Sequence, residues 1–341
     1  MHDDTVAQVK TRPFVDRLGI AMRASHILVL LFVVGGVIFA AIGTAMGDTF
    51  FLRLATDALI FAGLALSVDI LLGYTGLLSL GQALYFGLGA YVSALVLKQV
   101  PSFWAAMAAA LLISLVVGIV AGLIANRVRG VYFALVTFGL AQVVAKAIYN
   151  TRALGASDGL IGMPIVPIDF GVVTVMSNAP AGFLLVTLGV IVMLYAVSSY
   201  LLDTPFGRVL VAMRANERRV PFLGYSTRNA RLTAYVIAAV VAALSGALYP
   251  MLRGFVSPEL LFFSTSGNAV ITVVIGGVGT LAGALYGGVI LTVLKSVVGS
   301  MTANHLIVVG LLFMAVVIFL PKGLMGPVRP RIERLMARQA R

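Results

Sequence analysis

The sequence has no cysteine and only three histidines among its 341 residues. The absence of cysteine excludes disulfide bonds, zinc sites built on thiolates and a cysteine nucleophile, although it does not indicate a compartment. The histidines are His2, His26 and His305, and none has a neighbour at the spacing of a metal-binding motif such as HExxH. We therefore expect no metal site.

Signatures of enzymes are missing as well. The sequence has no GxxxxGKS/T loop, so we do not expect this chain to hydrolyse ATP. Asp57 and Asp69 are 12 positions apart, which is about 18 Å along a helix and too far for an aspartate dyad. We expect no catalytic residue and no bound cofactor.

Charged residues are scarce. They make up 11% of the sequence, against 61% apolar residues, and the mean hydropathy is +1.08. A typical soluble domain is about a quarter charged. The composition predicts an all-α integral membrane protein that crosses the bilayer many times, because helices satisfy their own backbone hydrogen bonds in lipid. The start of the chain lacks the short apolar core of a signal peptide, so we expect it to be retained.

Apolar stretches of about 17 to 25 residues are long enough to cross a membrane as helices. They predict a polytopic bundle of about nine to ten membrane segments in a single transmembrane domain, 24–320. The expected segments are Ala24 to Met46, Leu54 to Leu72, Leu80 to Leu97, Phe103 to Ala125, Val131 to Tyr149, Ala181 to Leu202, Leu232 to Leu252, a longer block Asn268 to Val298, and Asn304 to Leu320.

Basic residues are concentrated in four polar segments. The N-terminal tail 1–23, the turn Asn126 to Gly130, the loop 203–231 and the C-terminal tail 321–341 hold 18 of the 24 basic residues and six of the 12 acidic ones. The positive-inside rule places such segments in the cytoplasm. We expect contacts with anionic lipid and none with nucleic acid.

The loops 150–180 and 253–267 then lie outside. The C-terminal tail can return to the cytoplasm only if the block Asn268 to Val298 crosses the membrane an even number of times. Gly276, Gly277 and Gly279 mark a natural break. We therefore expect a broken or re-entrant helix pair near 268–298, buried in protein or lining a cavity.

The loop Asp203 to Arg231 carries six arginines against two acidic residues. Its middle, Val209 to Phe222, is long enough for about three to four helical turns and too charged to enter lipid. We expect Pro221 to break this helix and Gly224 to end it in left-handed backbone. The pattern favours a docking surface for a separate motor protein, and the alternative is a solvated loop held against anionic lipid.

Two kinds of side chain are expected to make this contact. Glu217 and the arginines around it should be exposed and form salt bridges with the partner, while Phe222, Leu223 and Tyr225 form an apolar anchor.

Small residues recur at every fourth position in several segments, for example Gly279, Gly283 and Gly287, which predicts closely packed helices. The stretch ALYFG at 83–87 also resembles ALYGG at 284–288, and each lies beside a glycine-rich break. Paired interrupted segments often flank the pathway of a transporter.

A charged side chain at the middle of a membrane costs about 3 kcal/mol, so such residues usually face a cavity or a partner. Lys146 and Lys295 lie near helix ends and are expected to extend to the membrane surface. Asp69 and Gln82 flank the break at 73–81 and are better pathway candidates, with structural hydrogen bonds as the alternative. The polar residues within the spans are Asp57, Asp69, Gln82, Gln142, Lys146, Asn268 and Lys295.

The segment LSVDILLGYTGLLSLGQA at 66–83, followed by GLGAY at 87–91, is similar to the signature of permease subunits of hydrophobic (branched-chain) amino-acid ABC importers. PFGR at 205–208, LGY at 223–225, GGVGTL at 276–281 and LPKGL at 320–324 are similar to other parts of that family. The resemblance extends from about Leu54 to Gly326 and is closest to the LivM-type subunit.

The resemblance implies a multi-pass permease of the bacterial inner membrane, with cytoplasmic termini, that imports branched-chain or other hydrophobic amino acids and forms half of a translocation pore. The implied partners are a second related permease, two cytoplasmic ATPase subunits that bind ATP, and a periplasmic or extracellular solute-binding protein. Many relatives have asparagine in place of Asp69 and histidine in place of Gln82, and the stretch 218–225 is also similar to importers of urea and short-chain amides. An amide importer is therefore one alternative, and a transporter driven by an ion gradient through Asp57 or Asp69 is another.

The basic loop, the glycine-rich breaks and the polar residues within the spans indicate which residues to test. The expected ATPase-coupling residues are Arg208, Arg214, Asn216, Glu217, Arg218, Arg219, Phe222, Leu223 and Gly224. The candidate pathway residues are Asp69, Gly73, Gly76, Ser79, Gln82, Asn268, Gly276, Gly277 and Gly279.

Overall fold

The computed structural model describes residues 14–169, 171, 174–301, 305–320 and 323–326. Most of the two predicted tails, 1–23 and 321–341, lies outside the described residues. The helices are α1 (Phe14–Met46), α2 (Thr49–Asp69), α3 (Gln82–Gln99), α4 (Phe103–Ala125), α5 (Val131–Asn150), α6 (Pro180–Asp203), α7 (Pro205–Asn216), α8 (Thr227–Ala247), α9 (Tyr249–Arg253), α10 (Phe263–Gly276), α11 (Ala282–Met301) and α12 (His305–Phe319).

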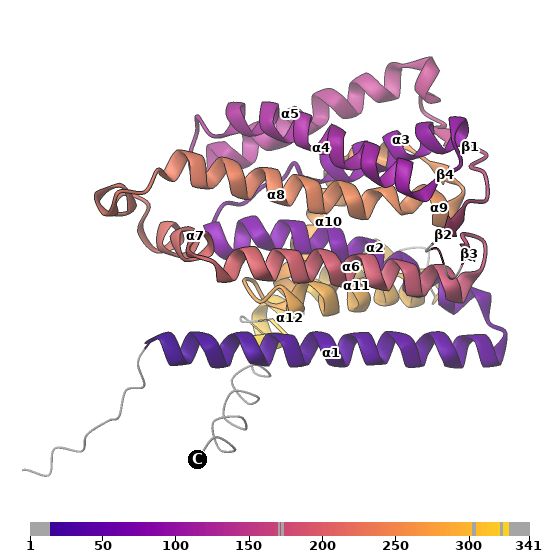
Figure 1. Cartoon of the computed structure of the whole chain (residues 1–341), viewed down its shortest axis with the longest axis horizontal. Helices are drawn as coiled ribbons and strands as arrows, with labels where there is room; N and C mark the ends of the chain where they lie inside the picture. The colour runs from indigo at the N-terminus through magenta and orange to yellow at the C-terminus, as the bar shows by residue number, and fades with distance from the viewer. Residues whose placement is uncertain (1–13, 170, 172–173, 302–304, 321–322, 327–341) are drawn as a thin grey trace, which may run out of the picture.

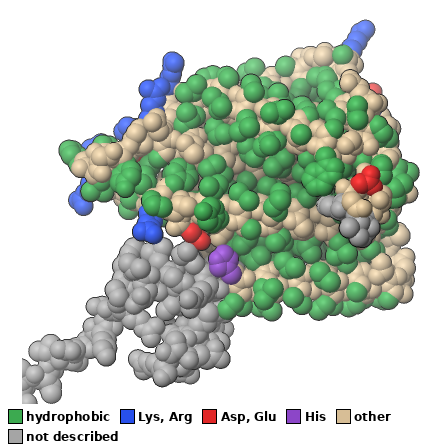
Figure 2. Space-filling view, in the orientation of Figure 1, with side chains coloured by type: hydrophobic (Ala, Val, Ile, Leu, Met, Phe, Trp, Pro, Cys, Tyr) green, Lys and Arg blue, Asp and Glu red, His purple; other side chains and the backbone are tan. Residues whose placement is uncertain are grey.

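The structure confirms an all-α membrane bundle. Among the described residues, seven helices are long and apolar enough to cross a membrane, and α10 and part of α12 are shorter apolar helices. Figure 2 shows that hydrophobic side chains cover the middle of this face, while most charged side chains lie near its two ends. Exposed leucine, isoleucine and valine side chains on α1 and α4, such as Leu30 at 63% and Leu112 at 63%, form a surface suited to lipid and not to water.

Helix α2 lies at the centre of the bundle. It packs against α11, α6, α8 and α10, and most of its residues are buried, whereas most of the described side chains of α1 are exposed. Helix α8 joins α2 to a second group formed by α3 and α4. In Figure 1 the helices run roughly parallel to one another, with α1 along one side and α5 along the other.

The two ends of the bundle differ in structure. Helix α7 lies at one end, which we call the α7 end, and the short strands lie at the other, the strand end (Figure 1). The strands are β1 (Leu160–Ile161), β2 (Pro167–Asp169), β3 (Thr174–Met176) and β4 (Phe255–Val256). β1 pairs with β4 and β2 pairs with β3, both antiparallel. The two loops predicted to lie outside, 150–180 and 253–267, therefore meet at the strand end.

Two membrane segments are interrupted. α2 continues into a π-helical turn, η1 (Ile70–Thr75), and stops at Gly76 in left-handed backbone with φ 72°, six residues before α3 begins. We call residues 70–81 the first break. The second break, residues 277–281, separates α10 from α11.

The second break confirms the predicted helix pair. The backbone of Gly276 lies against that of Gly283, and the Thr272 carbonyl lies against Gly287, so α10 and α11 pack as antiparallel neighbours. Gly283 and Gly287 thus pack helices of the same chain together, because glycine allows the backbones of α10 and α11 to touch. α10 has 14 residues and is shorter than the described helices long enough to cross a membrane, so the even number of crossings required of this block stays a prediction.

The helix predicted over Val209 to Phe222 is placed wrongly. α7 begins four residues earlier, at Pro205, because proline fits the first turn of a helix. It ends at Asn216, whose side-chain oxygen accepts a hydrogen bond from the Arg218 backbone N–H at 3.1 Å and closes a turn. A short 3₁₀ helix, η3 (Val220–Leu223), follows and ends at Gly224 with φ 82°, which confirms the left-handed stop.

Candidate functional site

The two breaks touch each other through Asp69. Its carboxylate is fully buried and accepts hydrogen bonds from the backbone N–H groups of Gly279 at 2.6 Å and Leu281 at 2.8 Å. Backbone donors freed by the second break are thus satisfied by a side chain from the end of α2. A carboxylate that accepts two N–H bonds forms strong, charge-assisted contacts, so Asp69 links α2 to the start of α11.

Gly73 completes this contact because it lacks a side chain. A Cβ atom at this position would lie 2.5 Å from Asp69 Oδ1 and 2.6 Å from the Gly279 Cα. Neither distance is compatible with a real carbon atom, so the two breaks can meet this closely only if position 73 is glycine. Of the predicted pathway residues, the structure therefore brings Asp69, Gly73 and Gly279 together.

A side chain from α7 reaches the same place. The Arg214 Nη1 atom donates a hydrogen bond to the carbonyl oxygen of Gly73. A Cβ at Gly76 would lie 3.0 Å from the Arg214 Cγ, and one at Gly279 would lie 3.3 Å from the Arg214 Nη1. Arg214 therefore contacts both breaks and connects α7 to the interrupted helices. We call Asp69, Gly73, Arg214 and Gly279 the junction.

The chain downstream of α12 also reaches the second break. The Leu324 backbone N–H donates a hydrogen bond to the Ile275 carbonyl at 2.8 Å. A Cβ at Gly323 would lie 2.6 Å from the Cα of Gly277. Gly276 and Gly277 thus serve close backbone packing in this structure.

Ser79 and Gln82 form a separate polar group. Both are buried, and the Gln82 amide nitrogen donates to Ser79 Oγ at 3.4 Å while the Ser67 hydroxyl donates to Gln82 Oε1 at 3.5 Å. These long hydrogen bonds join α2 to α3. They fit the structural alternative for Gln82 better than the pathway role.

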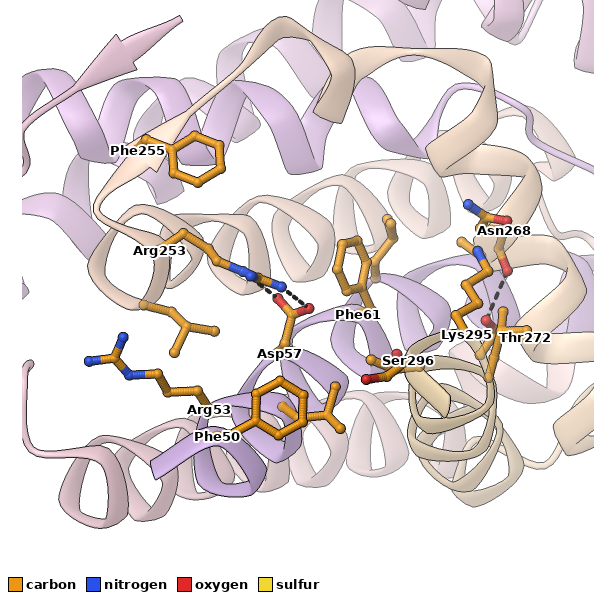
Figure 3. A pocket seen from close by; sticks show the side chains of 16 residues that line it. Phe50, Arg53, Asp57, Phe61, Arg253, Phe255, Asn268, Thr272, Lys295 and Ser296 are labelled. Atoms are coloured by element: carbon orange, nitrogen blue, oxygen red, sulfur yellow. Dashed lines mark hydrogen bonds and ion pairs between the residues drawn. The ribbon is translucent and has the colours of Figure 1, made fainter. Parts of the chain in front are cut away.

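Asn268 lies in a cavity of about 630 Å³ on the strand-end side of the junction. The cavity is lined by residues of α2, α9, β4, α10 and α11 (Figure 3). We call it the outer cavity. Its lining combines polar and charged side chains, such as Asn268, Asp57 and Lys295, with aromatic rings, such as Phe50 and Phe61.

Asp57 is paired inside the outer cavity. Its carboxylate accepts from Arg253 Nη2 at 2.7 Å and from Arg253 Nε at 3.4 Å. The Asp57 side chain is 8% exposed and that of Arg253 is 46% exposed. A two-point contact of this kind fixes both side chains, and it joins α2 to α9.

The two membrane lysines differ. Lys146 is exposed on α5, and its ammonium lies 5.0 Å from the centre of the Tyr149 ring near the end of that helix, as expected for a side chain extending to the membrane surface. Lys295 is half-buried and lines the outer cavity. Whether Lys295 also extends to the membrane surface, as expected for a lysine near a helix end, stays a prediction, but its side chain faces this cavity and not open lipid.

The loop after α7 presents an exposed apolar group at the α7 end. Phe222 is 90% exposed, Leu223 is 69% exposed and Tyr225 is 50% exposed, and Arg218 and Arg219 beside them are exposed as well. Large apolar side chains at such exposure in a charged loop are typical of a binding surface. Arg208 and Asn216 are also exposed, and Gly224 ends the turn that presents Phe222.

Glu217 is less exposed than predicted. Its side chain is only 25% exposed and lies 3.7 Å from Arg129 Nε and 3.5 Å from Arg231 Nη2. The Asn126 amide also donates to the Arg228 carbonyl at 2.7 Å. Glu217 therefore holds the 126–130 turn and the start of α8 together, because the 6%-exposed side chain of Arg231 needs a negative partner.

Sequence reasoning did not find the outer cavity as a unit. Asp57, Asn268 and Lys295 each stand out in the sequence as polar residues that are costly to bury, whereas Arg253 belongs to the loop expected outside and no local pattern connects it with them.

Comparison with known proteins gives a consistent family. The family profile described as "Branched-chain amino acid transport system / permease component" matches residues 50–318. The permease protein LivM of the high-affinity branched-chain amino acid transport system of Escherichia coli K12 is 28% identical over 335 residues, covering 92% of this chain and 79% of that protein.

A second type of permease also matches. LivH of the high-affinity branched-chain amino acid transport system of Salmonella typhimurium is 22% identical over 290 residues, covering 81% of this chain and 93% of that protein. The permease protein BraD of Pseudomonas aeruginosa is 26% identical over 145 residues, or 42% of this chain and 46% of that protein. No solved structure gives a significant match.

Proposed function

Because this chain belongs to the family of permease components of branched-chain amino acid transport systems, we propose that it forms half of the translocation pore of an ATP-driven importer of hydrophobic amino acids. It is a multi-pass membrane protein of the ABC importer permease class. The observation that carries the mechanism is the contact of Arg214 on α7 with Gly73 in the first break. It gives an exposed helix a direct connection to the interrupted membrane segments.

The partners follow from what this chain presents and from its relatives. Two differently named permease proteins, LivM and LivH, match it, which supports pairing with a second related permease. The exposed Phe222 and Leu223 beside arginines supply the apolar anchor and charged rim common in protein interfaces. We assign this surface to a cytoplasmic ATPase, one of two that bind ATP, and assign delivery of substrate to a solute-binding protein outside.

The orientation follows from charge. The 126–130 turn and the loop 203–231 are in contact through Arg129 and Glu217, so they lie on the same side, and the arginine-rich side of a membrane protein faces the cytoplasm. We therefore place the α7 end in the cytoplasm and the strand end outside, in a bacterial inner membrane. The binding protein would then contact the β1–β4 and β2–β3 strands.

The proposed cycle uses the junction as the transmitting element. When the ATPases bind ATP and approach each other, they displace α7, and Arg214 passes this displacement to Gly73 and Gly279. Because α2, α10 and α11 meet at these residues, their movement opens and closes access to the space near the membrane midplane. Packed helices with two discrete arrangements are the usual basis of such transitions.

The complete complex provides the test. We would purify tagged protein from native membranes with its associated subunits, identify them by mass spectrometry, and measure uptake of radiolabelled leucine into proteoliposomes supplied with the binding protein. We expect a second permease, two ATPases, and uptake that needs ATP and is unaffected by proton or sodium ionophores.

Two results would redirect the assignment. Uptake by this chain alone that collapses with ionophores would establish the gradient-driven alternative. ATP-dependent uptake of urea or acetamide without uptake of leucine would establish the amide importer.

A further inference from the structure

We propose that the outer cavity is a binding site for the transported amino acid, in which Lys295 binds the substrate carboxylate and an aromatic wall receives the apolar side chain. The inference rests on the proposed function, since it assigns a substrate site to the same transporter.

The charges in the outer cavity do not balance. Three cationic side chains line it, Arg53, Arg253 and Lys295, with one carboxylate, Asp57. Asp57 is occupied by the two-point contact with Arg253. No acidic side chain in the described part of the chain pairs with Lys295. The cavity therefore has a net attraction for an anion.

Lys295 is the cation that most needs a partner. It is half-buried on a membrane helix, where an uncompensated charge is costly, whereas Arg53 is exposed at the start of α2 and remains hydrated. Lys146 shows the ordinary arrangement of a membrane lysine, exposed and close to its own Tyr149 ring. A carboxylate brought by the substrate would compensate Lys295 through a charge-assisted hydrogen bond.

Neighbouring polar groups support a carboxylate at this end of the cavity. Figure 3 shows Lys295 beside Asn268 and Thr272, with Ser296 on the same helix as Lys295. The Thr272 hydroxyl is used in a bond to the Asn268 backbone carbonyl at 2.8 Å. The Asn268 side-chain amide forms no hydrogen bond with any other described residue, so its N–H groups remain available to a ligand.

The rest of the cavity suits an apolar side chain. Phe50, Phe61 and Phe255 line it along the direction away from Asn268 (Figure 3). The volume of about 630 Å³ lies within the range of small-molecule sites, about 300–1,000 Å³. A cationic end and an aromatic wall match a molecule with a carboxylate at one end and a hydrocarbon group at the other.

The test measures binding to the complete permease–ATPase complex in detergent, without the binding protein, so that the affinity reports the membrane site alone. The probe is tritiated L-leucine. The competitors are 4-methylpentanoate, which has the carboxylate without the ammonium group, and L-leucinamide, which has the ammonium group without the carboxylate. We expect 4-methylpentanoate to compete and L-leucinamide to compete at least about tenfold less well, because only the first can pair with Lys295.

The variants separate charge from structure. Lys295→Gln should weaken leucine binding by about tenfold or more, Lys295→Arg should stay within about threefold of wild type, and the control Lys146→Gln should bind as wild type does. Equal binding by Lys295→Gln and wild type would overturn the inference, as would equal competition by the two analogues. If Lys295→Gln does not assemble, the analogue competition on wild type decides alone.

The outcome is separable from that of the proposed function. Wild-type complex that imports leucine with ATP but shows no carboxylate preference refutes only the substrate site. Wild-type complex that imports no amino acid refutes the proposed function.

Discussion

The guanidinium group of Arg214 donates a hydrogen bond to the Gly73 carbonyl oxygen, so a side chain of an exposed helix completes the backbone of an interrupted membrane helix. The carbonyl lies in a π-helical turn, a form that is common at functional positions in helices. Arg214 is predicted to contact a partner ATPase, and its side chain also reaches into the bundle, to the place where α2, α10 and α11 meet. This double position makes α7 suited to transmitting movement.

Arg214→Ala should uncouple ATP hydrolysis from transport. Loss of the contact with Gly73 removes the link between α7 and the first break, and coupling energies of this kind correspond to about 5- to 150-fold effects. We expect the number of leucine molecules imported per ATP hydrolysed to fall by about tenfold, while the ATPase rate persists. The measurement is simultaneous uptake and phosphate release in proteoliposomes.

Arg208→Ala is the matched control, since Arg208 carries the same charge on the same helix and is exposed. If both variants lose coupling equally, the charge of the loop and not the Gly73 contact carries the effect.

Gly73→Ala should push the two breaks apart. The added methyl group would lie 2.5 Å from Asp69 Oδ1 and 2.6 Å from the Gly279 Cα, and overpacking of this kind costs about 1–3 kcal/mol. We expect a lower temperature of thermal unfolding and reduced uptake. Gly189→Ala on α6 is the control, because a Cβ there meets nothing within 4 Å and alanine favours a helix by about 0.5–1 kcal/mol. A Gly73→Ala protein as stable and active as Gly189→Ala would contradict the packing at the junction.

Asp69→Ala should destabilise the protein by about 2–5 kcal/mol, because it leaves two buried N–H groups without an acceptor. Asp69→Asn keeps one acceptor oxygen and should cost less. The measurement is the free energy of unfolding in detergent. Asp48 provides the comparison on the same helix, since it caps the exposed start of α2 by accepting from Phe50 and Phe51, and Asp48→Ala should cost about 1 kcal/mol. Equal costs at the two ends would show that the Asp69 contacts contribute little.

Phe222→Ala should weaken ATPase binding by about 30-fold, the effect expected when an anchor residue of an interface is truncated. Its side chain is 90% exposed, so the folded permease loses almost no internal packing. Affinity would be measured by titrating purified ATPase onto permease in nanodiscs. Leu112→Ala, which removes an exposed apolar side chain on α4, should leave ATPase affinity unchanged. Full affinity in the Phe222→Ala protein would favour the lipid-contacting loop.

The sequence predicts most of the membrane helices, because the bilayer fixes the length and hydropathy of a span. The predicted span Leu80 to Leu97 is the exception, since the corresponding α3 is not among the seven described helices that are long and apolar enough to cross a membrane. The segment Phe103 to Ala125 has the same bounds in α4. The charge pattern also predicts the helix pair in the block Asn268 to Val298, which the structure contains as α10 and α11, because basic segments are expected on one side of a membrane. Local backbone conformation can also be predicted, as shown by Gly224, which has the expected left-handed backbone at the end of η3.

Contacts between segments that are distant in the sequence could not be predicted. Asp69 meets Gly279 from 210 positions away, and no local pattern specifies which freed N–H group a buried carboxylate will bind. Glu217 is expected to face a partner protein, but in the structure its carboxylate forms a salt bridge with the buried side chain of Arg231. The side on which Lys295 points depends on how α11 rotates against α2, and a periodicity of small residues does not fix that rotation.

The pairing of Leu160 with Val256 closes the chain between these residues into a loop that contains α6, α7 and α8. α7 sits at one end of this loop and the β1–β4 hydrogen bonds fasten the other. At the strand end the chain is therefore held by hydrogen bonds and is not a free loop. A displacement of α7 that is transmitted along α8 would act on these hydrogen bonds. It would carry the 160–161 strand with it or break those hydrogen bonds, so in the proposed orientation a movement at the α7 end would reach the surface that we assign to the solute-binding protein.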